Sequence, residues 1–222
     1  MLQNLDNLRG LRILSSNLRN APLLVDSCQS LQKLQIEDNE IQFLPDNYFS
    51  GCAKLRIVNL RKNELKTLPS LQSATKTLVS ISIDYNRLTK CGLLCAGSFL
   101  KLRSLLLDKN YVEDLDVISL ARRWPSLVNI QVSGNKLKTL QDLSNSTFGN
   151  LAKNPRSQPI VLQAYDNPYM CDKAMSWLAG IQDEIKGLCL FYHIQVCLII
   201  HYNFAYSKRF FGLIFKTDRE KI

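Results

Sequence analysis

Few of the side chains and motifs on which enzymes depend occur in this chain of 222 residues. It has two histidines, His193 and His201, and it lacks the G-x-S-x-G, H-E-x-x-H and Walker glycine patterns of hydrolases, zinc proteases and nucleotide-binding proteins. Nine glycines and seven prolines are too few for a collagen-like or low-complexity chain. The sequence therefore predicts a globular protein without catalytic residues, cofactor, metal site or small-molecule substrate.

The sequence also lacks a segment in which charges of one sign are concentrated. The formal net charge is +9, but no run of five basic residues occurs, and nearly every segment rich in Lys and Arg also carries Asp or Glu. This scatter favours a role of the charge in solubility and argues against a nucleic-acid partner.

A secretory signal is also lacking at the start, where Met1 leads directly into repeat-like sequence. We expect a truncated N-terminus without its signal and cap, with an intracellular protein as the alternative.

A repeat of about 24 residues fills most of the chain. The pattern L-x-x-L-x-L-x-x-N-x-L occurs in five successive copies, a weaker copy with Ser16 in place of the asparagine precedes them, and a degenerate copy ends at Asn167. The alternation L-x-L predicts a short strand with one apolar face, and the repetition predicts strands that pair in parallel. Since no copy can bury its apolar face alone, we expect stability to come from the stacking of copies.

The asparagine of each copy is predicted to be structural. It falls where the chain leaves the strand and turns inside the core, and its amide can donate and accept at once. It can therefore satisfy backbone groups of the bend that would otherwise be buried without a partner. This predicted ladder consists of Asn39, Asn63, Asn86, Asn110, Asn135 and Asn167.

This repeat resembles that of the leucine-rich-repeat family, over residues 8–178. The resemblance implies an α/β solenoid with a curved parallel sheet on its concave face and irregular, 3-10 or helical connections on its convex side. Leu44, Pro45 and Phe49 follow the L-x-x-L-P-x-x-x-F pattern of the typical extracellular repeats in that family. In this register Cys28, Cys52 and Cys91 replace leucine in core columns, so we interpret them as small hydrophobes without a metal. Cys95 is interpreted as structural too.

The segment after the last repeat resembles the cysteine-rich C-terminal cap of extracellular family members. Asn167-Pro168 is followed by Cys171 and by Trp177-Leu178, but Lys173 stands where a second cysteine is expected. The resemblance then implies at most one disulfide in the cap, from Cys171 to Cys189. We expect repeats over 1–158, the last repeat and cap over 159–186, and an apolar tail over 187–222.

Three interpretations of this tail compete. A membrane helix needs about 20 apolar residues, whereas the cleanest run, 187–200, is 14 long and contains His193 and Gln195. Cys189, His193, Cys197 and His201 would form one helical stripe, but four ligands along a straight helix cannot surround one metal ion. We prefer a non-native or poorly packed extension outside the repeat fold. A membrane contact through this tail or through segments upstream stays an open alternative.

The outward-facing strand positions form a polar face of mixed charge, which suits a protein ligand. A solenoid's extended concavity is the surface that the family uses for binding. Asp84 and Asp108 are one row apart, but we expect no pocket that would desolvate them for catalysis. The predicted ligand-binding residues are Gln35, Glu37, Asn59, Arg61, Asp84, Tyr85, Leu106, Asp108, Lys109, Asn129 and Gln131.

The resemblance implies a non-enzymatic recognition module, a fragment of an extracellular or membrane-anchored protein of receptor or adhesion type. The sequon that begins at Asn145 is a candidate glycosylation site and slightly favours this location. The alternative is an intracellular adaptor or scaffold domain, located in the cytoplasm. Unpaired core cysteines and Lys173 favour that alternative.

Overall fold

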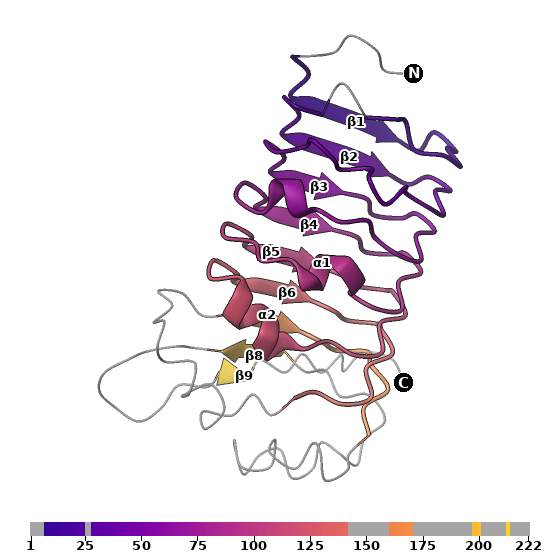
Figure 1. Ribbon diagram of the computed structural model, residues 1–222. Coiled ribbons are helices and arrows are strands. Elements are labelled where there is room, and N and C mark those ends of the chain that lie inside the picture. Colours follow the sequence, from indigo (N-terminus) through magenta and orange to yellow (C-terminus); the bar gives the residue numbers. More distant parts are fainter. Residues whose placement is uncertain (1–6, 25–27, 142–159, 171–196, 201–211, 214–222) are drawn as a thin grey trace.

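The predicted solenoid is confirmed by a computed structural model that describes residues 7–24, 28–141, 160–170, 197–200 and 212–213. Seven strands follow one another at one per repeat and pair in parallel in chain order (Figure 1). The pairing is in register with the repeat, so that Leu34 pairs with Leu11 on one side and Val58 on the other. The strands are β1 Gly10–Leu14, β2 Lys33–Glu37, β3 Ile57–Asn59, β4 Ser80–Ser82, β5 Ser104–Leu106, β6 Asn129–Gln131 and β7 Ile160–Gln163.

The connections between strands are short and varied, as the resemblance implies. They contain a 3-10 helix, η1 Gln72–Ala74, and two short α-helices, α1 Gly92–Ala96 and α2 Val117–Arg123. Asp116 caps α2, because its Oδ1 accepts a hydrogen bond of 2.8 Å from the backbone N–H of Ser119. In Figure 1 these helices lie in front of the sheet, on the return path from one strand to the next.

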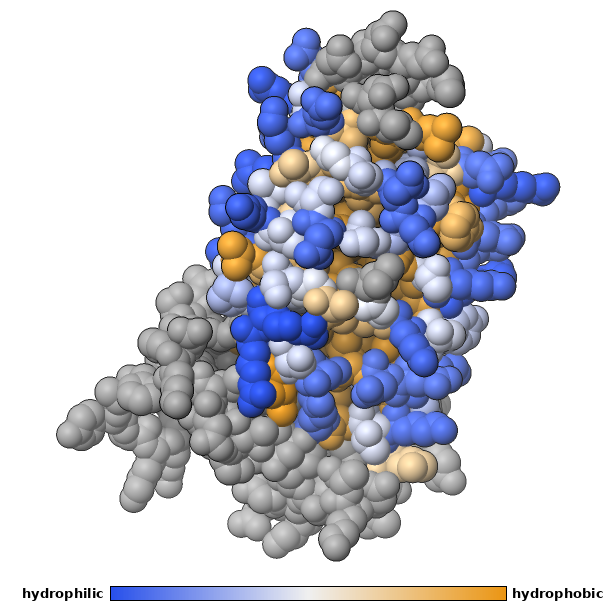
Figure 2. Space-filling view, in the orientation of Figure 1, coloured by the Kyte–Doolittle hydropathy of each residue, from blue (hydrophilic) through white to orange (hydrophobic). Residues whose placement is uncertain are grey.

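The apolar positions of the repeat form one continuous core. From the copy that opens at Leu31 to the copy that ends at Val132, the three strand-side apolar residues of each copy are 1% exposed or less. Burying such a side chain contributes about 1.5–3 kcal/mol, so stacking supplies most of the stability. Figure 2 shows this arrangement: hydrophilic side chains cover both flanks of the repeats, and hydrophobic ones lie between them.

Each ladder asparagine joins two neighbouring repeats. The Asn86 Nδ2 donates to the carbonyls of Leu60 at 2.9 Å and Ile83 at 3.0 Å, and its Oδ1 accepts from the N–H of Leu65 at 3.0 Å. The structure places the other ladder residues in the same kind of network, with the first, Asn39, bonded back to residues 16 and 18. The remaining ladder positions are Asn63, Asn110, Asn135 and Asn167.

The residue before each ladder asparagine adopts the left-handed backbone conformation. Its φ lies between 54° and 65° in every copy from the second onward. Only glycine adopts this conformation without cost, and other residues lose of order 1 kcal/mol or more there. The bend is therefore held by the ladder bonds that follow it. The residues at these bends are Asp38, Lys62, Tyr85, Lys109, Gly134 and Asp166.

The interpretation of the cysteines needs correction. Cys28 and Cys52 are fully buried in the core, but they form a disulfide instead of acting as separate small hydrophobes. They occupy equivalent positions of successive repeats, and their Cα atoms are 4.7 Å apart, within the range that a disulfide spans. Cys91 is only half-buried, and it forms a second disulfide with Cys95 across α1.

The tail contributes two short strands to the sheet. β8 Cys197–Ile200 pairs antiparallel with β7, and β9 Gly212–Leu213 pairs antiparallel with β8. For these residues this corrects the expectation that the tail lies outside the repeat fold, and the remaining domain boundaries stay predictions. Within the described ranges no helix has the length and hydrophobicity needed to cross a membrane. The predicted cap residues Cys171, Lys173 and Cys189, the Asn145 sequon and both histidines lie outside the described residues.

The ladder makes a direct prediction for stability. We expect Asn86→Leu to lower the free energy of unfolding by about 1–3 kcal/mol or more, because three buried backbone groups lose their partner. The matched control is Asn129→Leu, the same exchange at a half-buried position on the sheet face outside the ladder. Urea midpoints give the comparison, and equal midpoints for wild type and Asn86→Leu would contradict the structural role of the ladder.

A second prediction concerns the tail. Deleting residues 187–222 removes β8 and β9 but leaves the seven parallel strands and their core intact. The truncated chain is expected to keep its far-ultraviolet circular dichroism and to melt cooperatively. Loss of the cooperative transition would show that the antiparallel edge next to β7 is required for the repeats to fold.

Candidate binding face

The outward-facing side of the parallel sheet carries the residues predicted to bind a ligand. Strand registers bring equivalent positions of successive repeats into columns, as in the line Gln35, Asn59 and Ser82. With neighbouring strands about 4.8 Å apart, a column across five repeats is roughly 20 Å long. The predicted residues therefore do lie on one face, although they differ in how far they are available to a ligand.

An arginine–tyrosine pair lies just beyond the ends of β3 and β4, halfway along the stack of strands. The Arg61 guanidinium carbon lies 5.0 Å from the centroid of the Tyr85 ring, in cation–π geometry, and Tyr85 is 46% exposed. Ile57, at the start of β3, is 37% exposed. Large side chains of this kind commonly anchor protein interfaces, since they bury much area with little loss of freedom. Sequence reasoning placed Ile57 in a face column but did not select it.

Two carboxylates on the face are engaged with the protein's own backbone. The Asp84 Oδ1 accepts from the N–H of Asp108 at 2.9 Å, and its Oδ2 accepts from the Ser82 hydroxyl at 2.8 Å. One repeat further, the Asp108 Oδ1 accepts from the N–H of Ser133 at 2.6 Å. These bonds form a second ladder beside that of the asparagines. Asp84 and Asp108 thus stabilise the face itself, and little of either carboxylate is free for a ligand.

Burial changes the acidity of both groups. It raises the pKa of Asp84, against the opposing effects of the Ser82 and Asp108 hydrogen bonds and the charge of Arg61. It also raises the pKa of Asp108 to about 6, with the hydrogen bond from Ser133 acting in the opposite direction. The expectation that no pocket desolvates these two carboxylates for catalysis stays a prediction. They fold back against the next strand, and that contact excludes water.

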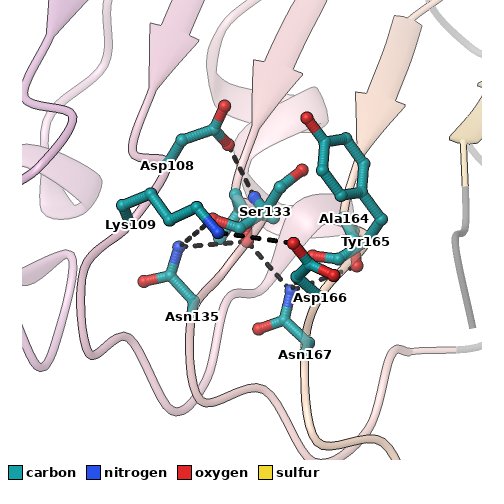
Figure 3. Close-up of polar contacts among 9 residues, drawn as sticks. Asp108, Lys109, Ser133, Asn135, Ala164, Tyr165, Asp166 and Asn167 are labelled. Atoms are coloured by element: carbon teal, nitrogen blue, oxygen red, sulfur yellow. Dashed lines mark hydrogen bonds and ion pairs between the residues drawn. The ribbon is translucent and has the colours of Figure 1, made fainter. Parts of the chain in front are cut away.

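At the C-terminal end of the face, the Lys109 side chain extends past the next repeat and reaches Asp166 (Figure 3). The Lys109 Nζ lies 3.3 Å from the Asp166 Oδ2, although the two residues are 57 positions apart. The lysine passes over Gly134, where a Cβ would lie 2.5 Å from its Cδ. Glycine at 134 therefore serves both the left-handed bend and this close approach. No local pattern in the sequence indicates this ion pair.

The remaining predicted residues are half-buried, and all of them except Leu106 are polar. Gln35 donates to Glu37 at 3.3 Å, and the Asn59 Oδ1 accepts from the N–H of Arg61 at 3.0 Å. These bonds hold the side chains in place but leave part of each surface open to solvent. The other half-buried positions are Leu106, Asn129 and Gln131.

A separate hollow lies away from the face, between α1 and α2. Its volume is about 450 Å³, and its lining includes the Cys91–Cys95 pair, Leu120 and Arg123. Charges of both signs line it, among them Asp114. It was not indicated by the sequence, because it forms only where two helical connections follow each other.

Comparisons with known proteins agree with this architecture. The leucine rich repeat family model matches residues 29–88. Osteomodulin of Bos taurus is 25% identical over 143 residues, which is 62% of this chain and 32% of that protein. Fibromodulin of Sus scrofa is 30% identical over 122 residues, covering 54% of this chain and 78% of that sequence. The chain thus belongs to the leucine-rich-repeat family, and it spans about a third of the length of osteomodulin.

Solved structures give the same result for the fold. The leucine-rich repeat domain of APL1B superimposes with a TM-score of 0.51 at 26% identity, over 60% of this chain and 38% of that chain. A chain of the LRIM1/APL1C complex gives a TM-score of 0.51 at 25% identity, over 59% of this chain and 24% of that chain.

The desolvated Asp108 predicts an unusual pH dependence. Between about pH 4 and pH 6 this carboxyl holds a proton in the folded protein but has released it in the unfolded chain. Its contribution therefore makes the folded state less stable as pH rises through this window. Asp108→Asn keeps the acceptor for Ser133 and cannot ionise, so its stability should equal that of wild type near pH 4 and exceed it near pH 7 by of order 1 kcal/mol, after allowance for screening.

Thermal midpoints between pH 4 and pH 7.5 test this. The exposed Asp114→Asn controls for the change in net charge. A difference between Asp108→Asn and wild type that stays constant across this range would contradict the desolvated state of Asp108.

Proposed function

We propose that this chain is a non-enzymatic recognition module that binds a protein ligand on the outward-facing side of its parallel sheet. The observation that carries the proposal is the cation–π pair of Arg61 and the exposed Tyr85, on a face where Gln35, Glu37 and Asn59 are held by hydrogen bonds. A rigid face loses little side-chain freedom on binding, which favours affinity. The similar LRIM1/APL1C structure is that of a complex, which supports a role in protein assembly.

We further propose that the module belongs to an extracellular or cell-surface protein. Disulfides form and persist in oxidising compartments, and the described residues contain two, Cys28–Cys52 and Cys91–Cys95. The alternative of an intracellular adaptor rested partly on unpaired core cysteines, and that support is lost.

Two variants that lose the same charge, one at the anchor and one outside the face, test the binding face. The chain is expressed through a secretory pathway and measured by biolayer interferometry against a panel of purified extracellular protein domains. Arg61→Ala combined with Tyr85→Asn should weaken binding of a panel member at least tenfold, because asparagine tolerates the left-handed backbone at position 85 while the aromatic anchor is lost.

The matched control is Lys136→Ala combined with Tyr111→Asn, which removes an exposed cation and an exposed tyrosine from outside the face. Its affinity should stay within twofold of wild type. Equal weakening by both variants, or no binding by any panel member, would contradict the proposal.

A non-reducing peptide map of the secreted protein checks Cys28–Cys52, and free thiols there would contradict the extracellular location.

A further inference from the structure

The edge of the sheet where the strands begin carries a line of basic side chains. It consists of exposed residues from the segments that lead into β2 to β5, and we name it the basic edge: Lys33, Lys54, Arg56, Lys76, Lys101 and Arg103. In the first repeat Arg9 continues the line. In Figure 1 this edge follows the tails of the strand arrows down the stack. Each of the first five repeats therefore places at least one cation on it.

Acidic residues are absent from the basic edge and lie at the opposite edge and in the connections that follow it. The segments 28–33, 52–57, 75–80, 99–104 and 124–129, which lead into the strands, contain no Asp or Glu. Every Asp and Glu among the described residues instead lies at the end of a strand or in the connection that follows it. The ion pairs Arg19–Glu40 and Arg87–Glu64 lie in those connections as well. The segments of the basic edge therefore carry positive charge and no carboxylate of their own.

Backbone hydrogen bonds fix the spacing of these cations. The carbonyl of Arg56 accepts from the N–H of Val79, whose carbonyl accepts from the N–H of Arg103. Arg56 and Arg103 are therefore two strands apart, which is about 10 Å. Arg9 is related to Arg56 in the same way through residue 32. Arg9, Arg56 and Arg103 thus recur at every second strand over about 20 Å, and the four lysines lie at other positions of the same edge.

A regular row of cations suits a linear polyanion. A single-stranded nucleic acid would also need exposed aromatic rings on which its bases stack. The aromatic side chains of these segments, Phe99 and Trp124, are at most 1% exposed. A folded acidic protein would present an irregular surface and would require an apolar centre, whereas the exposed apolar side chains here, Ile57 and Leu100, belong to different repeats.

We infer that the basic edge binds a sulfated polysaccharide of the extracellular space. Sulfate groups recur along such a chain and need only positive charge at matching intervals. The choice of an extracellular polyanion rests on the proposed location of the protein, but the site is separate from the face that contains Arg61 and Tyr85. Binding is electrostatic and depends steeply on salt, because each contact releases condensed counterions.

The test compares two variants of equal charge. The first is Lys54→Gln, Arg56→Gln and Lys101→Gln on the basic edge. The second, the control, is Lys66→Gln, Lys136→Gln and Lys138→Gln, three exposed lysines beyond the ends of the strands. Isothermal titration with a size-defined heparin oligosaccharide is carried out at several NaCl concentrations. We expect the edge variant to lose at least tenfold in affinity and to lower the salt slope by roughly three, and the control to stay within twofold.

Equal losses in both variants would show attraction to net charge alone and overturn the inference, as would no binding of heparin by wild type. Hyaluronan, which lacks sulfate, should bind at least tenfold more weakly than heparin. Tighter binding of a single-stranded oligonucleotide through the same residues would assign the edge to nucleic acid instead. Both variants keep Arg61 and Tyr85. A negative result with heparin would therefore not contradict the proposed protein-binding face.

Discussion

The left-handed bend at the end of every strand is the constraint on which the rest of the structure depends. A residue with positive φ, such as Lys62 or Tyr85, turns the chain out of the sheet and leaves backbone groups inside the core. The next residue is an asparagine whose amide satisfies those groups in its own repeat and in the preceding one. Because each amide bonds two repeats, no repeat can complete its bend alone, and stacking and bending become one cooperative event.

The same constraint fixes the face. Since every strand ends at the same bend, equivalent side chains must lie in columns, and a carboxylate in one repeat reaches the backbone of the next. Asp84 and Asp108 use this proximity to form a second ladder, with the consequence that both are desolvated. The face therefore combines groups that hold the sheet together with a smaller set, centred on Arg61 and Tyr85, that remains open to a ligand.

The fold could be predicted from the sequence because the spacing of the leucines and asparagines fixes the register of each repeat. The L-x-L alternation and the asparagine period assign each residue to core, face or bend without any knowledge of contacts between repeats. What could not be predicted depends on those contacts. Cys28 and Cys52 appear 24 residues apart in the sequence, and only the register of the stack brings them within reach of a disulfide. The ion pair from Lys109 to Asp166 likewise depends on Gly134 between them.

The basic edge shows how charge that is scattered in the linear sequence is distributed in the fold. A window of ten residues samples one repeat and mixes strand beginnings with strand ends, so that Arg56 and Glu64 are counted together. The parallel stack separates them to opposite edges and adds up the cations of successive repeats. Positions on the edge also differ from those on the face in what a substitution disturbs. Replacing Asp108 by a residue that cannot accept a hydrogen bond breaks a bond to the next strand, whereas Lys54 and Lys101 are exposed side chains on the surface of their segments. The edge can therefore carry a dense positive charge with little consequence for folding, and the face cannot.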